Sequence, residues 1–118
     1  MLFLVFKAIH YKKIPISEVK ESGAEGVKVR WLINKKNDGA ENFAMRLFEI
    51  APSGHTPKHS HSWEHEVFVL KGTGTVFCEG SESQLKPGYA VFVPPNAEHC
   101  FKNNGKRTLS FLCLVPHD

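Results

Sequence analysis

The sequence lacks any concentration of basic residues, and no run of lysine or arginine is longer than a pair. Its formal net charge is only +3 at pH 7. Nucleic-acid-binding surfaces depend on basic patches, so this distribution argues against a nucleic-acid partner. No apolar stretch is long enough to span a bilayer. Residues 1–6 are too few for the core of a signal peptide, so we expect neither a membrane partner nor export.

Cysteine is also scarce, and the three cysteines form no closely spaced pair. Cys78, Cys100 and Cys113 are an odd number, and they lack the CxxC spacing of thiolate zinc sites. Disulfide scaffolds belong to oxidising compartments and use cysteines in pairs. The sequence therefore predicts free thiols in a reducing compartment, and we expect a cytoplasmic protein.

Short apolar segments separated by turns are abundant. Hydrophobic residues make up 42% of the chain and charged residues 23%, as in ordinary globular domains. Apolar runs at 27–33, 43–50 and 108–115 are bounded by polar or glycine-containing turns, and 51–54 is one such turn. No helical pattern exceeds two turns. We predict one all-β domain over residues 1–118, in which a small barrel or jelly roll closes the strands.

Three histidines lie close together in the middle of the chain, at positions i, i+2 and i+6: His59, His61 and His65. Pro57 before them and the apolar residues after them favour an extended strand, which we expect to form a hairpin with the next strand. Side chains alternate between the faces of a strand, so all three imidazoles and Trp63 would share one face. Three neutral nitrogen donors on one face are typical of a transition-metal site.

The histidines belong to a longer pattern of spacings that continues along the chain. In the first segment the pattern residues are Ser53, His59, His61, His65 and Gly72. In the second segment they are Gly88, Pro94, Asn96, His99 and Asn103. The two segments resemble the paired motifs of the cupin superfamily, G-x5-H-x-H-x3-E-x6-G and G-x5-P-x-G-x2-H-x3-N. The likeness extends to small single-domain cupins that carry four histidines.

This resemblance, carried by residues 53–103, implies a cupin jelly-roll barrel that holds one divalent metal ion. It implies His99 as the fourth ligand beside the three histidines of the first motif. Imidazole suits many transition metals; the likeness favours manganese, then iron, with zinc, nickel or copper possible. It further implies a small-molecule substrate and a homodimer, in which residues 1–20 are a possible subunit-exchange strand.

The chain departs from the motifs at three positions. Ser53 replaces the first glycine, and Gly54 beside it can supply the turn. Asn96 replaces another glycine, and asparagine tolerates the left-handed conformation better than most residues. His65 replaces the usual glutamate ligand, and the neighbouring Glu66 is the alternative. Strand alternation favours His65, because Glu66 faces away unless a bulge intervenes.

The exchange of glutamate for histidine changes the charge of the site. A divalent ion keeps about two net positive charges with four neutral histidines, and about one when a carboxylate is among the ligands. Such a site favours enolate, carboxylate, peroxide or superoxide. The resemblance implies a manganese- or iron-dependent oxygenase that uses dioxygen or peroxide to cleave a C–C or C=C bond. A non-redox isomerase or epimerase and a non-catalytic ligand-binding cupin are the alternatives.

Side chains that share a face with the histidines are the candidates for the pocket. Trp63 lies two positions from both His61 and His65, and Phe101 lies two positions after His99. In an extended strand, each would therefore share a face with these histidines. Phe111 and Cys113 share one face of the last strand, which the resemblance directs into the barrel. These four residues predict a pocket for a small, partly apolar or aromatic compound.

Arg46 is a charged residue in a strand whose two faces are mostly apolar. A guanidinium in such surroundings needs a partner. We interpret Arg46 either as one half of an ion pair with a nearby carboxylate or as a group that orients an anionic substrate in the pocket.

Overall fold

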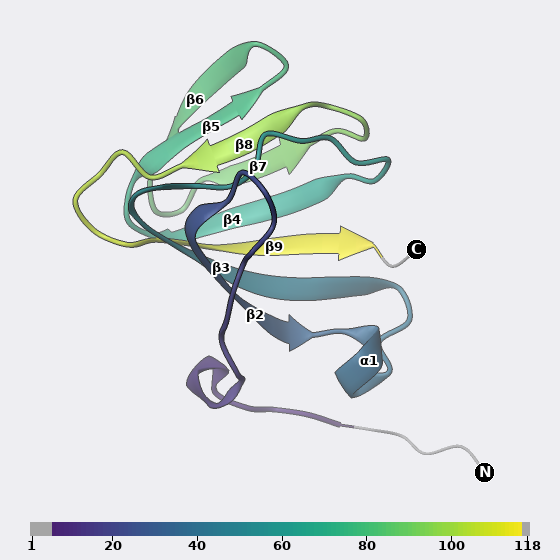
Figure 1. Ribbon diagram of the computed structural model, residues 1–118. Helices are drawn as coiled ribbons and strands as arrows, with labels where there is room; N and C mark the ends of the chain where they lie inside the picture. Colours follow the sequence, from purple (N-terminus) through teal and green to yellow (C-terminus); the bar gives the residue numbers. More distant parts are fainter. Residues whose placement is uncertain (1–5, 117–118) are drawn as a thin grey trace.

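Strands make up most of the computed structural model, which describes residues 6–116 (Figure 1). The strands are β1 (Ser17–Glu18), β2 (Glu25–Ile33), β3 (Phe43–His55), β4 (His65–Lys71), β5 (Gly74–Cys78), β6 (Ser81–Leu85), β7 (Ala90–Val93), β8 (His99–Lys102) and β9 (Leu109–Pro116). β2, whose sequence alternates Val27, Val29 and Trp31 with polar residues, is one of the longer strands, as strand propensity and alternation predict. A 3-10 helix η1 (Tyr11–Lys13) precedes the first strand, and a one-turn helix α1 (Lys35–Asp38) lies between β2 and β3.

The strands form one curled antiparallel sheet in the order β6-β5-β8-β3-β9-β4-β7. β2 pairs with β3, and β1 pairs with β2. Figure 1 shows the sheet bent like half of a barrel, with the β5–β6 hairpin at one end and β2 at the other. The predicted all-β jelly-roll fold is confirmed by this architecture.

The core lies on the inner face of the curl, where alternating side chains from opposite strands meet. In β4, His65, Val67 and Val69 are buried while Glu66 and Phe68 are exposed. β9 is central between β3 and β4, and its inward side chains are buried as well. Each fully buried aliphatic or aromatic side chain stabilises the fold by about 1.5–3 kcal/mol. Burial of apolar side chains on the inner face therefore stabilises the curled sheet.

β3 continues through residues 51–54, so the turn predicted there is wrong. The backbone of this stretch pairs with the loop after β8: Ser53 donates to the carbonyl of Asn103 at 2.9 Å, and Asn103 donates to that of Gly54 at 3.0 Å. Ser53 itself takes the left-handed conformation, with φ 70°. Gly54 is needed for a different reason, which is close packing of two backbone segments. A Cβ atom at this position would lie 2.6 Å from the carbonyl oxygen of Glu25.

The hairpin predicted between the histidine strand and the next strand does not form. β4 pairs with β7 and β9, whereas β5 pairs with β6 and β8. Gly72, with φ 81°, redirects the chain from one half of the curled sheet to the other. Asn96 has φ 66°, which confirms the left-handed conformation expected where it replaces a glycine.

The predicted subunit-exchange strand lies in the N-terminal segment. Residues 1–5 of the proposed exchange strand lie outside the described residues. Further along, Ser17 of β1 pairs with Val29 of β2 in the same chain.

Among the described residues, no helix has the length and apolar character needed to cross a membrane.

Candidate metal centre

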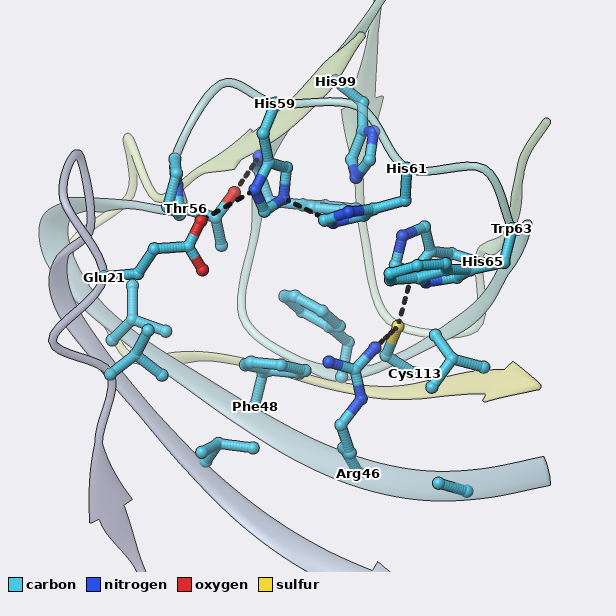
Figure 2. A pocket seen from close by; sticks show the side chains of 18 of the residues that line it. Glu21, Arg46, Phe48, Thr56, His59, His61, Trp63, His65, His99 and Cys113 are labelled. Carbon is cyan, nitrogen blue, oxygen red and sulfur yellow. Dashed lines mark hydrogen bonds and ion pairs between the residues drawn. The ribbon is translucent and has the colours of Figure 1, made fainter. Parts of the chain in front are cut away.

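Four histidines approach one cavity from different segments (Figure 2). His59 and His99 form an isolated bridge, with their backbones exchanging hydrogen bonds of 3.2 and 2.9 Å. His61 lies in the connecting loop, and His65 is the first residue of β4. The predicted continuous strand from His59 to His65 is therefore wrong, because bends at residues 62–63 separate the bridge from β4. The rings converge because neighbouring segments of the fold present them together.

Three of these side chains form a compact cluster. One ligand atom from each of His59, His61 and His99 lies within 4.8 Å of the others. The Nε2 atoms of His59 and His61 are 3.2 Å apart. The ring of His65 lies beside this cluster, with its centre 4.9 Å from that of His99 and 5.3 Å from that of His61. The cluster of three can hold a metal ion, and the fourth predicted ligand is adjacent to it.

Three of the imidazoles make contacts through Nδ1, on the other side of the ring from Nε2. The contacts are His59 to Glu21 Oε2 (3.0 Å), His99 to the carbonyl of Ala97 (2.9 Å) and His65 to Cys113 Sγ (3.5 Å). Metal-binding histidines typically donate their second N–H to a carboxylate or carbonyl, which fixes the tautomer. When Nδ1 carries the hydrogen, Nε2 keeps its lone pair for an ion.

His65 supplies the test of whether these residues fit a metal. Its Nε2 atom is buried and has no hydrogen-bond partner, a situation that costs about 1–3 kcal/mol. Burial, followed by the repulsion that a protonated His65 would meet from His99 and Arg46, lowers the pKa of His65 to about 3. Burial also lowers the pKa of His61 and of His99. These imidazoles are therefore disposed to be neutral near pH 7, the state that a metal ion requires, and the donor set fits a divalent transition metal.

The acidic neighbours of His65 lie on the other face of the strand. Glu64 and Glu66 are exposed and line a separate surface hollow with Phe43 and Leu114. Glu66 pairs in register with Phe92 of β7 without a shift, so no bulge turns its carboxylate inward.

The cavity below the histidines has a volume of about 370 Å³. Trp63, Phe101, Phe111 and Cys113, the four predicted pocket residues, all line it. Trp63 stacks on His61, with ring centres 4.5 Å apart and planes 4° from parallel. Phe101 and Phe111 stack with centres 4.8 Å apart. The walls are thus largely aromatic, as expected for a partly apolar ligand.

Sequence reasoning missed several residues that also line the cavity, including Glu21, Trp31 and Phe48. Phe48 shares a strand face with Arg46, so alternation could have identified it. Trp31 pairs with Arg46 across β2 and β3, and this register is fixed only by the tertiary structure. Glu21 carried no such signal, since it lies in a loop 38 positions before His59.

Arg46 lines the cavity without forming an ion pair with any carboxylate of residues 6–116. The paired-charge interpretation is therefore wrong for this part of the chain. One terminal nitrogen donates to Cys113 Sγ at 3.1 Å, and Nε is buried without a partner. The guanidinium carbon lies 5.4 Å from the Trp31 ring centre and 4.9 Å from that of Phe48. Aromatic faces supply only part of the charge compensation that a carboxylate would give.

The fold and the histidine cluster define a cupin. The model of the cupin domain family matches residues 46–115, which is more than half of the chain, and the chain belongs to that family. The polyketide cyclase RemF from Streptomyces resistomycificus is similar in structure, with a TM-score of 0.90 and 34% identity. That match covers 97% of this chain and 81% of the cyclase.

Curated relatives include enzymes of other kinds. The 1-methylthio-D-xylulose 5-phosphate methylsulfurylase of Rhodospirillum rubrum is 34% identical over 60% of this chain and 46% of its own length. Dimethylsulfoniopropionate lyase DddW of Ruegeria pomeroyi is 26% identical over 78% of this chain and 60% of its own length. The chain thus spans about half to three fifths of these two relatives, and their differing names assign no single reaction to it.

Proposed function

We propose that His59, His61, His65 and His99 hold one manganese or iron ion and that this chain is a metal-dependent oxygenase. The observation that carries the proposal is the lack of a free general base at the cavity. Its lining contains one carboxylate among the described residues, Glu21, and that group is bound to His59. Proton abstraction by a side chain is therefore poorly provided for, and the ion, when bound, supplies the chemistry.

The substrate we propose is a small, partly aromatic molecule with an anionic oxygen. Trp63, Phe101 and Phe111 supply flat apolar walls. Arg46 has an unpartnered Nε and no carboxylate partner among residues 6–116, so an anionic group of the substrate would complete its interactions. In the cleavage of a C=C bond by dioxygen, each alkene carbon receives one oxygen atom, and two carbonyl products balance the reaction.

The test begins with elemental analysis of the purified protein, followed by removal of the metal and reloading with manganese, iron or zinc. Each form is assayed on a panel of aryl alkenes and aryl 1,3-dicarbonyls, with and without dioxygen or peroxide. We expect turnover that requires manganese or iron together with the oxidant. Zinc-supported turnover under nitrogen would refute the oxygenase proposal. A protein that takes up none of the three metals would refute the metal site itself.

A non-redox reaction is the second candidate, and the similarity to a polyketide cyclase over 97% of the chain favours it. A divalent ion can polarise a carbonyl as a Lewis acid, which promotes enolisation and ring closure. Turnover of the 1,3-dicarbonyl compounds with zinc and without oxidant would support this candidate.

Arg46 offers a test of the substrate class. Replacing it with alanine (R46A) should raise KM for a carboxylate-bearing substrate by at least about tenfold, since a charge-assisted hydrogen bond contributes about 1.5–3 kcal/mol. The uncharged amide analogue of the same substrate is the control, and its KM should rise much less. An equal loss for both compounds would show that Arg46 shapes the pocket without binding an anion.

We also propose a homodimer that works in a reducing compartment. Exposed apolar side chains on β4 and β7, among them Phe68 and Phe92, give a second copy a surface to cover. Light scattering should then report twice the chain mass of 13.3 kDa. The absence of disulfides among Cys78, Cys100 and Cys113 supports the cytoplasm as the compartment.

A further inference from the structure

Glu21 contacts the histidine cluster from a loop outside the two histidine-bearing segments. Its Oε2 atom lies 3.0 Å from Nδ1 of His59, as the dashed line in Figure 2 shows. We propose that Glu21 is a positioning residue for the metal centre: its carboxylate orients the His59 imidazole and supplies the negative charge that an all-histidine ligand set lacks. This inference rests on the metal site proposed above.

The loop that carries Glu21 is held in place by several contacts. Val19 donates a backbone hydrogen bond to Val27 at 2.9 Å, and Ala24 donates one to the carbonyl of Glu21 at 3.0 Å. Gly23, with φ 92°, brings the loop against Pro57, where a Cβ atom would lie 3.4 Å from that of the proline. These contacts anchor both sides of Glu21 next to the segment that carries His59.

The contact determines which nitrogen of His59 can bind an ion. A carboxylate at Nδ1 accepts a hydrogen bond, so the hydrogen resides on Nδ1 and the lone pair on Nε2. Nε2 of His59 lies 3.2 Å from Nε2 of His61, inside the cluster. Without a cation, two lone pairs at this distance repel each other, and the pair is relieved only by a hydrogen on one of them. Glu21 thus favours the tautomer of His59 whose Nε2 lone pair is available to an ion.

Glu21 differs from the other outer partners in its charge. Ala97 offers His99 a neutral carbonyl, and Cys113 offers His65 a sulfur whose pKa is raised by burial. Four neutral ligands leave a divalent ion with about two positive charges. A carboxylate one imidazole away offsets part of that charge and strengthens His59 as a donor. The carboxylate missing from the ligand set is thereby replaced in the next layer.

The test compares metal affinity in three variants of the full chain. E21A removes both the hydrogen bond and the charge, whereas E21Q keeps an acceptor oxygen and removes only the charge. E25Q is the matched control, because Glu25 pairs with His55 at 3.6 Å outside the cluster. Chelator competition with Mn²⁺ and Zn²⁺ measures the dissociation constant of each protein, and circular dichroism checks the fold.

We expect E21A to weaken metal binding by roughly 10–100-fold, the usual effect of losing an outer partner. E21Q should fall between E21A and wild type, and E25Q should match wild type. Nitrogen NMR of the metal-free protein should find the hydrogen of His59 on Nδ1 in wild type and redistributed in E21A. That readout does not depend on activity of the loaded protein.

Two results separate this inference from the proposed function. If wild type binds metal and both Glu21 variants bind it equally well, the positioning role is wrong and the metal site stands. If wild type binds neither ion, the metal site is wrong and the role of Glu21 falls with it. A loss of affinity as large in E25Q as in E21Q would also overturn the inference, because the effect would then be one of general surface charge.

Discussion

At the scale of single residues, the proposed fourth metal ligand is a choice between two neighbours. His65 and Glu66 are adjacent in the sequence, and both are common metal ligands. His65 is only 6% exposed, whereas Glu66 is exposed on the outside of the sheet. The buried Nε2 atom of His65 also has no hydrogen-bond partner. Alternation along β4 therefore favours the histidine as the proposed fourth ligand.

Alanine substitutions at these neighbours should have opposite effects on metal content. H65A should lose metal affinity by at least about tenfold, since it removes one of four donors, while E66A should keep roughly one ion per chain. Elemental analysis after dialysis against a weak chelator measures both. Loss of metal in E66A with retention in H65A would assign the ligand to Glu66.

At the scale of elements, the path between β4 and β5 depends on one glycine. Gly72 has φ 81°, and a Cβ atom there would overlap the carbonyl oxygen of Thr108 and lie 2.9 Å from Cα of Leu109. The β4–β5 crossover passes directly over the start of β9, where only a glycine leaves room. Gly80, in the β5–β6 hairpin, has nearly the same φ of 80° but nothing within 4 Å of the added atom.

The two glycines allow backbone strain to be separated from crowding. G80A should lower the free energy of unfolding by about 1–2 kcal/mol, the cost of the left-handed conformation for a residue with a Cβ atom. G72A should lower it by roughly 2–5 kcal/mol, because crowding against backbone adds about 1–3 kcal/mol. Urea unfolding of both variants measures the difference. Equal losses would mean that the crossover relaxes around the methyl group.

At the scale of the whole molecule, the histidine cluster makes the stability of the metal-free protein depend on pH. The pKa of His65 falls from 6.5 to about 3 on folding, and those of His61 and His99 also fall. Between these limits the unfolded chain binds more protons than the folded chain, so stability rises with pH. The contribution is complete above about pH 6.5 and is lost progressively as the pH falls toward 3.

We therefore expect the urea midpoint of the metal-free protein to be lower at pH 4.5 than at pH 7.5. The variant H65Q should show a smaller change between the two pH values, because one of the shifted groups is gone. H55Q is the control outside the cluster and should keep the wild-type change. A wild-type midpoint that does not move over this range would contradict the neutral state of the buried imidazoles.

Much of the candidate site could be predicted from the sequence because it depends on spacing within short segments of the chain. The spacing of the first motif identified His59 and His61, and the resemblance to the paired motifs added His99. Alternation placed His65 inward and Glu66 outward, and alternation with the resemblance put Phe101, Phe111 and Cys113 on faces that line the cavity. The residues between strands were harder. Hydrogen bonding between distant segments, such as Ser53 with Asn103, extended β3 past the predicted turn.

What the sequence alone determined is the all-β class and, with the resemblance to the paired motifs, the candidate histidines and the inward faces of the strands that follow them, since these depend on periodicity and spacing along the chain. Only the tertiary structure decided which strands pair, how the histidine segment bends, and that Glu21 reaches His59. It also decided that Arg46 meets a sulfur and two aromatic rings and pairs with no carboxylate of residues 6–116. The physical reason is that these contacts join residues tens of positions apart, and curling the sheet brings them together.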